Sequence, residues 1–350
     1  MVGILDDDIV MVKDQSEGSR LYTKGNYGYP RSKGGVDLDL VEATYLVECN
    51  RLQVESEGEI MTFDELFRHS ASVLDGFDIK YMVYRDLRQR GFVVKMESGL
   101  YDLSVLPRGK TLSNSRPEFY VSAVSERNPV DISQFIAQLE RLRKKDKRLL
   151  YGVVDGDGDT VYYEMFIRDP AGETFPEGVG GKALGWLIRD RVFVFDFEDA
   201  EILRNYGFYG NMMNDTMQLS LVESCHLISK GKLKVLSPDE EELDFNDLRE
   251  FGSTLQKDFA KRLMIYSDLR ERGLVVKTGF KYGTDFRAYT KSPDDCHARY
   301  LAHTVTEDDL KTWPDISRTV RLSTGVKKEI LFGRVVKNDI QYLEFKWFRP

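Results

Sequence analysis

The chain repeats itself. The segments YRDLRQRGFVVK (84–95) and YSDLRERGLVVK (266–277) lie 182 residues apart and are identical at 9 of 12 positions. The same offset, or one residue less, aligns further groups: Leu21, Gly25 and Gly28 with Leu203, Gly207 and Gly210; Leu40-Val41-Glu42 with Leu221-Val222-Glu223; Phe63-Asp64-Glu65-Leu66 with Phe245-Asn246-Asp247-Leu248. So many groups in one register define two copies of a unit of roughly 170 to 180 residues, too long for a solenoid repeat. The chain therefore resembles a fused dimer.

The pattern within each copy predicts a mixed α/β (α+β) fold. In the second copy Phe259, Leu263, Tyr266 and Leu269 recur at helical spacing. Gly273 then ends the helix, and Leu274-Val275-Val276 begins a strand. We expect each repeat to pair a small helix-and-sheet N-terminal subdomain with a mixed-sheet, restriction-nuclease-like C-terminal subdomain. The expected boundaries are 1–78 and 79–170 in the first repeat, a Pro- and Gly-rich linker at 171–182, and 183–260 and 261–350 in the second.

Composition restricts the class of protein. Hydrophobic residues make up 41% of the chain and charged residues 31%, which is enough for packed cores. No apolar run approaches the roughly 20 residues of a membrane span, and the N-terminus carries acids where a signal peptide carries basic residues. We therefore expect a cytoplasmic protein with no membrane partner. Three scattered cysteines, Cys49, Cys225 and Cys296, argue against a disulfide framework or a structural zinc site.

The charge is divided unevenly along the chain. The formal net charge of −8 argues at first against a nucleic-acid partner. Residues 257–350, however, contain 19 Lys and Arg against 13 Asp and Glu, a net charge of +6, which leaves −14 for the rest. The last part of the chain is therefore basic and suited to binding RNA, whereas the remainder is acidic.

The two copies differ after their shared Val-Val-Lys. The register pairs Tyr289 with Leu106, His297 with Arg116, and Lys328 with Lys147. One copy thus has Tyr, His and Lys, whereas the other has only the Lys. This asymmetry suggests an active unit beside a scaffold unit.

Tyr, His and Lys together suit the cleavage of RNA through its own 2′-hydroxyl. That reaction needs a base, an acid and a cation beside the transition state, and it requires no metal. Histidine suits the acid and lysine the cation, whereas a tyrosine becomes a useful base only where nearby cations lower its pKa. Singly, each residue also has a structural interpretation, and His303, within an alternating strand pattern, reads as structural.

The second copy resembles the archaeal tRNA-intron splicing endonucleases. The resemblance is carried by YSDLRERGLVVKTGFKYGTDFRAY (266–289), DDCHARYLAHTV (294–305) and VRLSTGVKKEILFGRVV (320–336). The first copy resembles the same family through 84–95 and YGVVDGDGDTVYYEMF (151–166). The arrangement is similar to the homodimeric class, in which each chain fuses a pseudo-catalytic unit to a catalytic one.

This resemblance implies an activity and the residues for it. It implies excision of introns from precursor tRNA at bulge-helix-bulge junctions by a homodimer, without a metal or other cofactor, leaving 2′,3′-cyclic phosphate and 5′-hydroxyl ends. Tyr289 would be the general base, His297 the general acid and Lys328 the transition-state cation. Arg321 would stack on a bulged base, with Lys346 or Arg349 as the second cation.

The run DGDGD (155–159) has two interpretations. It fails as a calcium-binding EF-hand loop, which would need Gly in place of Thr160 and Glu in place of Phe166. It fits a tight, solvated β-turn. The resemblance implies instead that Asp155, Asp157 and Asp159 form an acidic loop that inserts into a basic cleft of the facing unit. The second copy has only VKNDI (336–340) at this place, which favours the docking interpretation.

Two other functions remain open. The chain could be a non-catalytic RNA-binding subunit that awaits a partner enzyme, although the Tyr-His-Lys set argues against this. A metal-dependent nuclease of the restriction type would need an acidic pair followed by a Glu-x-Lys motif on a strand, and it is the least supported of the three.

Overall fold

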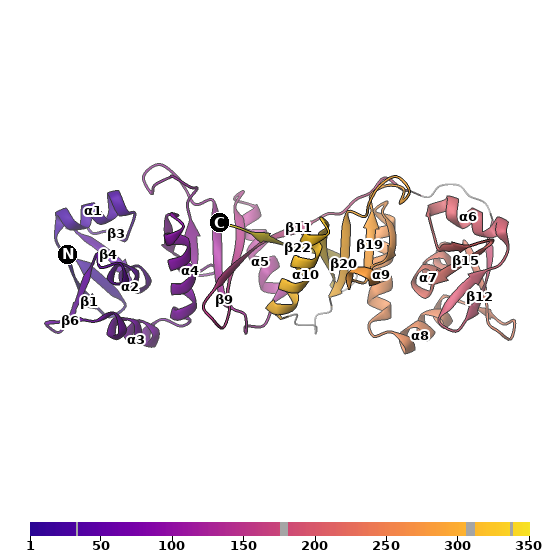
Figure 1. Ribbon diagram of the computed structural model, residues 1–350, viewed down its shortest axis with the longest axis horizontal. Coiled ribbons are helices and arrows are strands. Elements are labelled where there is room, and N and C mark those ends of the chain that lie inside the picture. Colours follow the sequence, from indigo (N-terminus) through magenta and orange to yellow (C-terminus); the bar gives the residue numbers. More distant parts are fainter. Residues whose placement is uncertain (33, 176–180, 306–311, 337–338) are drawn as a thin grey trace. The chain divides into compact units, whose positions relative to one another are not determined.

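The computed structural model describes residues 1–32, 34–175, 181–305, 312–336 and 339–350 (Figure 1). The chain forms two compact units. One comprises Met1–Phe166 with Lys311–Ser317 and Lys346–Pro350, and the other comprises Ile167–Leu310 with Arg318–Phe345. Each unit is thus built mainly from one repeat.

The N-terminal parts of the two repeats contain the same elements in the same order. In the first repeat these are β1 (Val2–Asp6), β2 (Ile9–Val12), α1 (Gln15–Gly25), β3 (Tyr29–Pro30), β4 (Val36–Asp39), α2 (Leu40–Glu48), β5 (Gln53–Ser56), β6 (Glu59–Met61) and α3 (Phe63–Val73). In the second they are β12 (Ala183–Ile188), β13 (Arg191–Val194), α6 (Phe197–Gly207), β14 (Asn211–Met213), β15 (Thr216–Ser220), α7 (Leu221–Ser229), β16 (Leu233–Leu236), β17 (Glu242–Leu243) and α8 (Phe245–Leu255). The strand orders, β3-β4-β2-β1-β5-β6 and β14-β15-β13-β12-β16-β17, are equivalent.

The C-terminal parts are equivalent as well. The first repeat continues with α4 (Phe77–Gln89), β7 (Val94–Met96), β8 (Leu103–Val105), β9 (Phe119–Ser125), α5 (Ile132–Arg143), β10 (Arg148–Val154) and β11 (Thr160–Arg168). The second continues with α9 (Phe259–Glu271), β18 (Val275–Thr278), a 3₁₀ helix (Phe280–Tyr282), β19 (Phe286–Tyr289), β20 (Tyr300–Val305), α10 (Trp313–Gly325), β21 (Glu329–Val336) and β22 (Asp339–Phe348). Strands β9 and β10 are parallel, as are β20 and β21, and in each pair one helix joins the two strands. The prediction of a duplicated, mixed α/β fold is confirmed.

Local sequence explains where several helices begin and end. Thr62 and Glu65 form a capping box at the start of α3, and Asp244 and Asp247 form one at the start of α8. This shared cap accounts for the alignment of residues 63–66 with 245–248. Helix α9 ends before Gly273, whose φ of 77° favours glycine, and the predicted helix stop is confirmed.

In each repeat one hydrophobic core extends from the N-terminal part into the C-terminal part. In the first repeat the core extends from Val10 to Tyr162, and in the second from Ala183 to Tyr342. The predicted apolar stripe of α9 is buried within the second core. The N- and C-terminal parts of a repeat are therefore packed together, and the predicted boundaries between them stay a prediction.

Two further predictions concern the cysteines and membrane-spanning helices. The three cysteines are free: Cys49 is exposed, Cys225 buried and Cys296 partly buried. None of the described helices combines the length and the apolar character that a membrane span requires.

Candidate active site

Strands β19 and β20 bring Tyr289 close to the segment that contains His297. Tyr289 is the last residue of β19, and its side chain is partly buried. Ala288 pairs with Tyr300 of β20, and the Arg299 amide donates to the Ala288 carbonyl at 3.0 Å. Residues 297–299 therefore lie beside the end of β19, with His297 exposed in the connecting loop.

Lys328 reaches the same place from the next strand. It directly precedes β21, whose first residue, Glu329, pairs with Tyr300. The Lys328 ammonium donates to the Ala298 carbonyl at 2.9 Å, one residue from His297, and lies 5.7 Å from the centroid of the Tyr282 ring. The structure thus brings the three predicted positions to one end of the sheet in the second unit.

This end of the sheet combines a partly buried phenol, an exposed imidazole and a partly buried ammonium group. A second cation lies close by, because the Arg287 guanidinium is 5.8 Å from the centroid of the Tyr289 ring. Within the described ranges no three His, Cys, Asp or Glu side chains are grouped closely enough to hold a metal ion.

Part of the predicted linker is fixed next to this site. The Glu173 amide donates to the Thr290 carbonyl at 2.8 Å, and the Thr174 amide donates to the Gly273 carbonyl at 2.9 Å. A Cβ atom on Gly172 would lie 2.2 Å from the Gly273 carbonyl oxygen, so only glycine fits there. Residues 172–174 thus pack against Arg272 and Gly273, before β18, and against Thr290, which follows β19. The Pro and Gly content of this segment had predicted only a linker. Its residues 176–180 lie outside the described residues.

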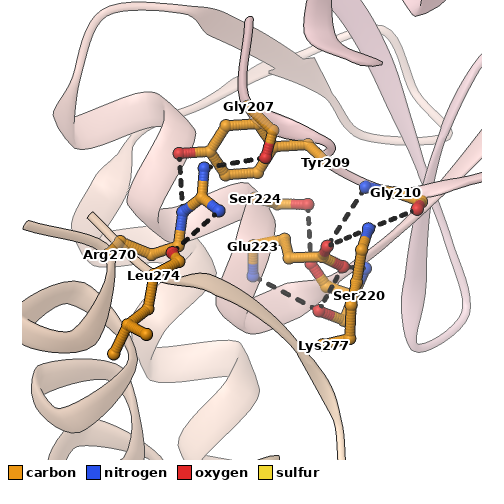
Figure 2. Close-up of polar contacts among 9 residues, drawn as sticks. All are labelled: Gly207, Tyr209, Gly210, Ser220, Glu223, Ser224, Arg270, Leu274 and Lys277. Carbon is orange, nitrogen blue, oxygen red and sulfur yellow. Dashed lines mark hydrogen bonds and ion pairs between the residues drawn. The ribbon is translucent and has the colours of Figure 1, made fainter. Parts of the chain in front are cut away.

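A buried polar network holds the start of β18 to the N-terminal part of the second repeat (Figure 2). The side chain of Arg270, on α9, is 4% exposed. Its guanidinium donates to the carbonyls of Gly207 at 2.9 Å and Leu274 at 3.2 Å, and to the Tyr209 hydroxyl at 3.2 Å. One side chain therefore ties three segments together.

Lys277 and Glu223 form the second half of this network (Figure 2). The Lys277 ammonium donates to the Gly210 carbonyl at 2.6 Å and lies 3.6 Å from the Glu223 carboxylate. Glu223 in turn accepts from the Gly210 amide at 3.1 Å and from both the amide and the hydroxyl of Ser220. Burial lowers the pKa of Lys277, whereas the Glu223 charge opposes that shift.

The first repeat contains the same network. The Arg88 guanidinium donates to the Gly25 carbonyl at 2.8 Å. Lys95 donates to the Gly28 carbonyl at 3.2 Å and to Glu42 at 2.6 Å. These positions are among those that the sequence offset aligns. Sequence reasoning found the repetition but missed its role; the available signal was an arginine, Arg88 and Arg270, that recurs at the same position of both copies.

The predicted RNA-binding residues lie in different units. Arg321 is exposed on α10 in the second unit. Lys346 is exposed in the part of β22 that belongs to the first unit, where the Arg349 guanidinium also lies 4.2 Å from the centroid of the Trp347 ring. The pairing of Arg321 with a second cation stays a prediction.

The acidic loop forms a tight turn between β10 and β11. Asp155 stabilises the turn, because its carboxylate accepts from the amides of Asp157 and Asp159, each at 3.0 Å. Asp157 and Asp159 are exposed. The turn interpretation is confirmed. The docking role stays a prediction, and the exposed side chains of Asp157 and Asp159 are available for it. In the second copy, residues 337–338 lie outside the described residues.

Two other histidines have structural surroundings. His303 lies in β20, as the alternation predicted, and its ring stacks on Phe332 with centroids 6.0 Å apart. His226 is 2% exposed, and its Nδ1 lies 3.0 Å from the Ser267 hydroxyl. Burial lowers the pKa of His226 to about 3, and the charges of Arg270 and Lys230 add to the shift.

The buried His226 predicts a loss of stability in mild acid. Unfolding restores its pKa to about 6.5, so at lower pH the unfolded chain binds one more proton and the folded state loses stability. Above pH 6.5 the group has no effect, and the loss grows until the pH reaches about 3. Between pH 7 and pH 5 the wild type should lose about 2 kcal/mol more than His226→Gln. Denaturant unfolding at both pH values measures this, and equal losses would contradict it.

Comparison with known proteins agrees with this duplicated fold. A family model described as the tRNA intron endonuclease N-terminal domain matches residues 1–67 and 183–249, and one described as the catalytic C-terminal domain matches 77–163 and 259–342. The chain therefore belongs to the tRNA intron endonuclease family, and the resemblance predicted from its motifs is confirmed.

Its relatives include both full-length and half-length proteins. A tRNA-splicing endonuclease of Methanococcoides burtonii is 33% identical over 93% of each chain. Another, of Methanosarcina mazei, is 33% identical over 95% of this chain and 98% of its own. A tRNA-splicing endonuclease of Sulfurisphaera tokodaii is 35% identical, and 99% of its length aligns with 47% of this chain. Such a protein has the length of a single repeat, which agrees with the duplication.

Proposed function

We propose that this chain excises introns from precursor tRNA at bulge-helix-bulge junctions, without a metal ion, by attack of the RNA 2′-hydroxyl. The observation that supports this most is the convergence of Tyr289, His297 and Lys328 at one end of the sheet in the second repeat. The first repeat retains only Lys147 of the three. The second repeat is therefore the catalytic one.

Each residue has one task in this mechanism. Tyr289 accepts the proton of the 2′-hydroxyl, and the Arg287 guanidinium lies 5.8 Å from the centroid of its ring. The 2′-oxygen bonds to phosphorus while the bond from phosphorus to the 5′-oxygen breaks, and His297 donates a proton to the departing oxygen. The Lys328 ammonium stabilises the charge on the non-bridging oxygens. The products are a 2′,3′-cyclic phosphate and a 5′-hydroxyl.

The remaining predicted residues bind the RNA and join two copies of the chain. Arg321, with Lys346 or Arg349, grips a bulged base through its π-face. Asp157 and Asp159 of the acidic loop dock onto a second copy, which gives a homodimer. Two catalytic repeats per dimer suit a substrate that is cut at two junctions.

One experiment tests the reaction directly. Purified protein is incubated with an end-labelled bulge-helix-bulge RNA, and the fragment ends are identified with and without excess EDTA. We expect cyclic phosphate and 5′-hydroxyl ends, and equal rates in both conditions. Ends that carry a 5′-phosphate, or loss of activity with EDTA, would contradict the mechanism. Binding without any cutting would favour the alternative, a non-catalytic RNA-binding subunit.

A further inference from the structure

A cavity in the first repeat has features that the proposed reaction does not use. Its volume is about 370 Å³, at the lower end of the usual range for small-ligand pockets. It lies between the loop after β7, the start of β9 and the C-terminal end of α5, and its lining includes Glu97, Tyr101, Tyr120, Arg141 and Lys145. All of these residues belong to the first unit.

Two tyrosines provide an aromatic surface in this cavity. The ring centroids of Tyr101 and Tyr120 are 5.0 Å apart, and both side chains are partly exposed. The Tyr101 hydroxyl donates to the Gln138 carbonyl at 3.1 Å, and the buried Gln138 amide group donates to the Leu100 carbonyl at 2.6 Å. The loop that carries Tyr101 is thus fixed against α5. Fixed aromatic rings are the surfaces on which single-stranded nucleic acids stack their bases.

A dense group of cations borders the same cavity. The segment RLRKKDKR (141–148) holds six basic residues and one acid. Arg148 is paired with Glu118 and Glu164, but the other five cations form no ion pair with any described residue. Basic residues at a helix C-terminus interact favourably with the helix dipole. This interaction does not explain why Arg141 and Lys145 line the cavity that contains Tyr101 and Tyr120. Unpaired cations beside aromatic rings suit an RNA phosphate backbone.

The second repeat lacks this combination. The repeat register places Gly283 at the position of Tyr101, Leu301 at Tyr120, Leu322 at Arg141 and Val326 at Lys145. The combination of rings and cations is therefore confined to the repeat without the Tyr-His pair.

We propose that this cavity binds a nucleotide of single-stranded RNA and is distinct from the proposed cleavage site, which belongs to the other unit. The base stacks on Tyr101 and Tyr120, Arg141 and Lys145 bind the flanking phosphates, and Glu97 accepts a hydrogen bond from an exocyclic amine of the base. A base offers the two tyrosine rings a face to stack on and Glu97 an exocyclic amine, which an acidic side chain does not, and this favours RNA as the occupant. The inference rests on the proposed function only in that the chain acts on RNA. It makes the first repeat a substrate-binding unit as well as a scaffold.

Binding of a short RNA tests the proposal. A fluorescent single-stranded RNA of about twelve nucleotides, within the site sizes of single-strand binders, is titrated against full-length chain carrying His297→Ala, so that the proposed chemistry is blocked. We expect R141Q/K145Q to weaken binding about tenfold and to reduce the slope of log K against log salt by about 1.4. The matched control R143Q/K144Q removes the same charge from the same segment outside the cavity, and it should change binding less than about twofold.

A second variant isolates stacking. Tyr120→Leu introduces the residue that the second repeat has at this register, and it should weaken binding at least about fivefold with no change in the salt slope. Equal weakening by both charge variants would overturn the proposal, as would no weakening by any variant. A changed oligomeric state in R141Q/K145Q with unchanged RNA binding would instead assign the surface to a protein partner. Because the readout is binding, failure here leaves the cleavage proposal intact, and absence of cleavage leaves this result interpretable.

Discussion

Lys328→Met is expected to lower the rate constant for cleavage of bulge-helix-bulge RNA by about 100- to 1,000-fold, as removal of one transition-state donor does in other enzymes. The reason is that, in the proposed mechanism, Lys328 supplies the fixed positive charge for the non-bridging oxygens, and the Ala298 carbonyl holds its ammonium at 2.9 Å. Substrate binding should change little, because this charge is needed most where negative charge develops. Single-turnover kinetics and a binding titration separate the two quantities.

Lys327 provides a matched control one residue earlier. It is exposed, and its substitution by methionine removes the same formal charge from the same turn. Lys327→Met should keep the cleavage rate within about threefold of the wild type, since exposed charges act weakly through solvent. Equal losses in both variants would show that only the overall charge of this surface matters, and Lys328 would lose its assigned role.

Lys95→Met is expected to lower the free energy of unfolding of the first unit by about 3–5 kcal/mol, the usual cost of removing one partner of a buried ion pair. The ammonium of Lys95 lies 2.6 Å from the Glu42 carboxylate, and the two side chains are 7% and 0% exposed. Without Lys95, Glu42 keeps the Gly28 amide as a donor at 2.9 Å but has no buried cation beside it. Denaturant unfolding measures the loss.

The second repeat supplies the comparison. Lys277 lies farther from Glu223, at 3.6 Å, and these side chains are 17% and 11% exposed, so Lys277→Met should cost less than Lys95→Met. The double variant E42Q/K95M should be less destabilised than K95M alone, because the buried Glu42 charge that lost its partner is removed. If Lys95→Met and Lys277→Met each lowered the free energy of unfolding by less than about 1 kcal/mol, water would be screening the ion pairs. The network would then contribute little to stability.

The sequence predicted the regular parts of the fold well. The repeat register, the stripe on α9 and the stop at Gly273 follow from periodicity and glycine chemistry, which act locally. The network around Arg270 and Lys277 could not be predicted in this way. An arginine on a helix is ordinarily a surface residue, and here its partners, Gly207 and Tyr209, come from a loop about sixty residues earlier.

The candidate site was predictable as residues but not as geometry. The difference between the copies singled out Tyr289 and His297, whereas Lys328 has a counterpart in Lys147. Strand pairing brings these positions of the second copy together. Two contacts had no sequence signal: the Ala298 carbonyl that holds Lys328, and the Glu173 amide on Thr290. Both depend on where a loop lies in space, which hydrophobic pattern and turn chemistry do not determine.

The duplicated network separates the residues that hold the molecule together from those proposed to act on RNA. Arg270, Lys277 and Glu223 stabilise the frame of the second repeat (Figure 2), whereas Tyr289 and His297 take part in none of the hydrogen bonds of these three side chains. A copy of the gene segment could therefore change its acid and base without loss of folding, because Arg88, Lys95 and Glu42 preserve the frame. Such independence lets one duplicate acquire the proposed RNA-binding surface while the other keeps the proposed chemistry.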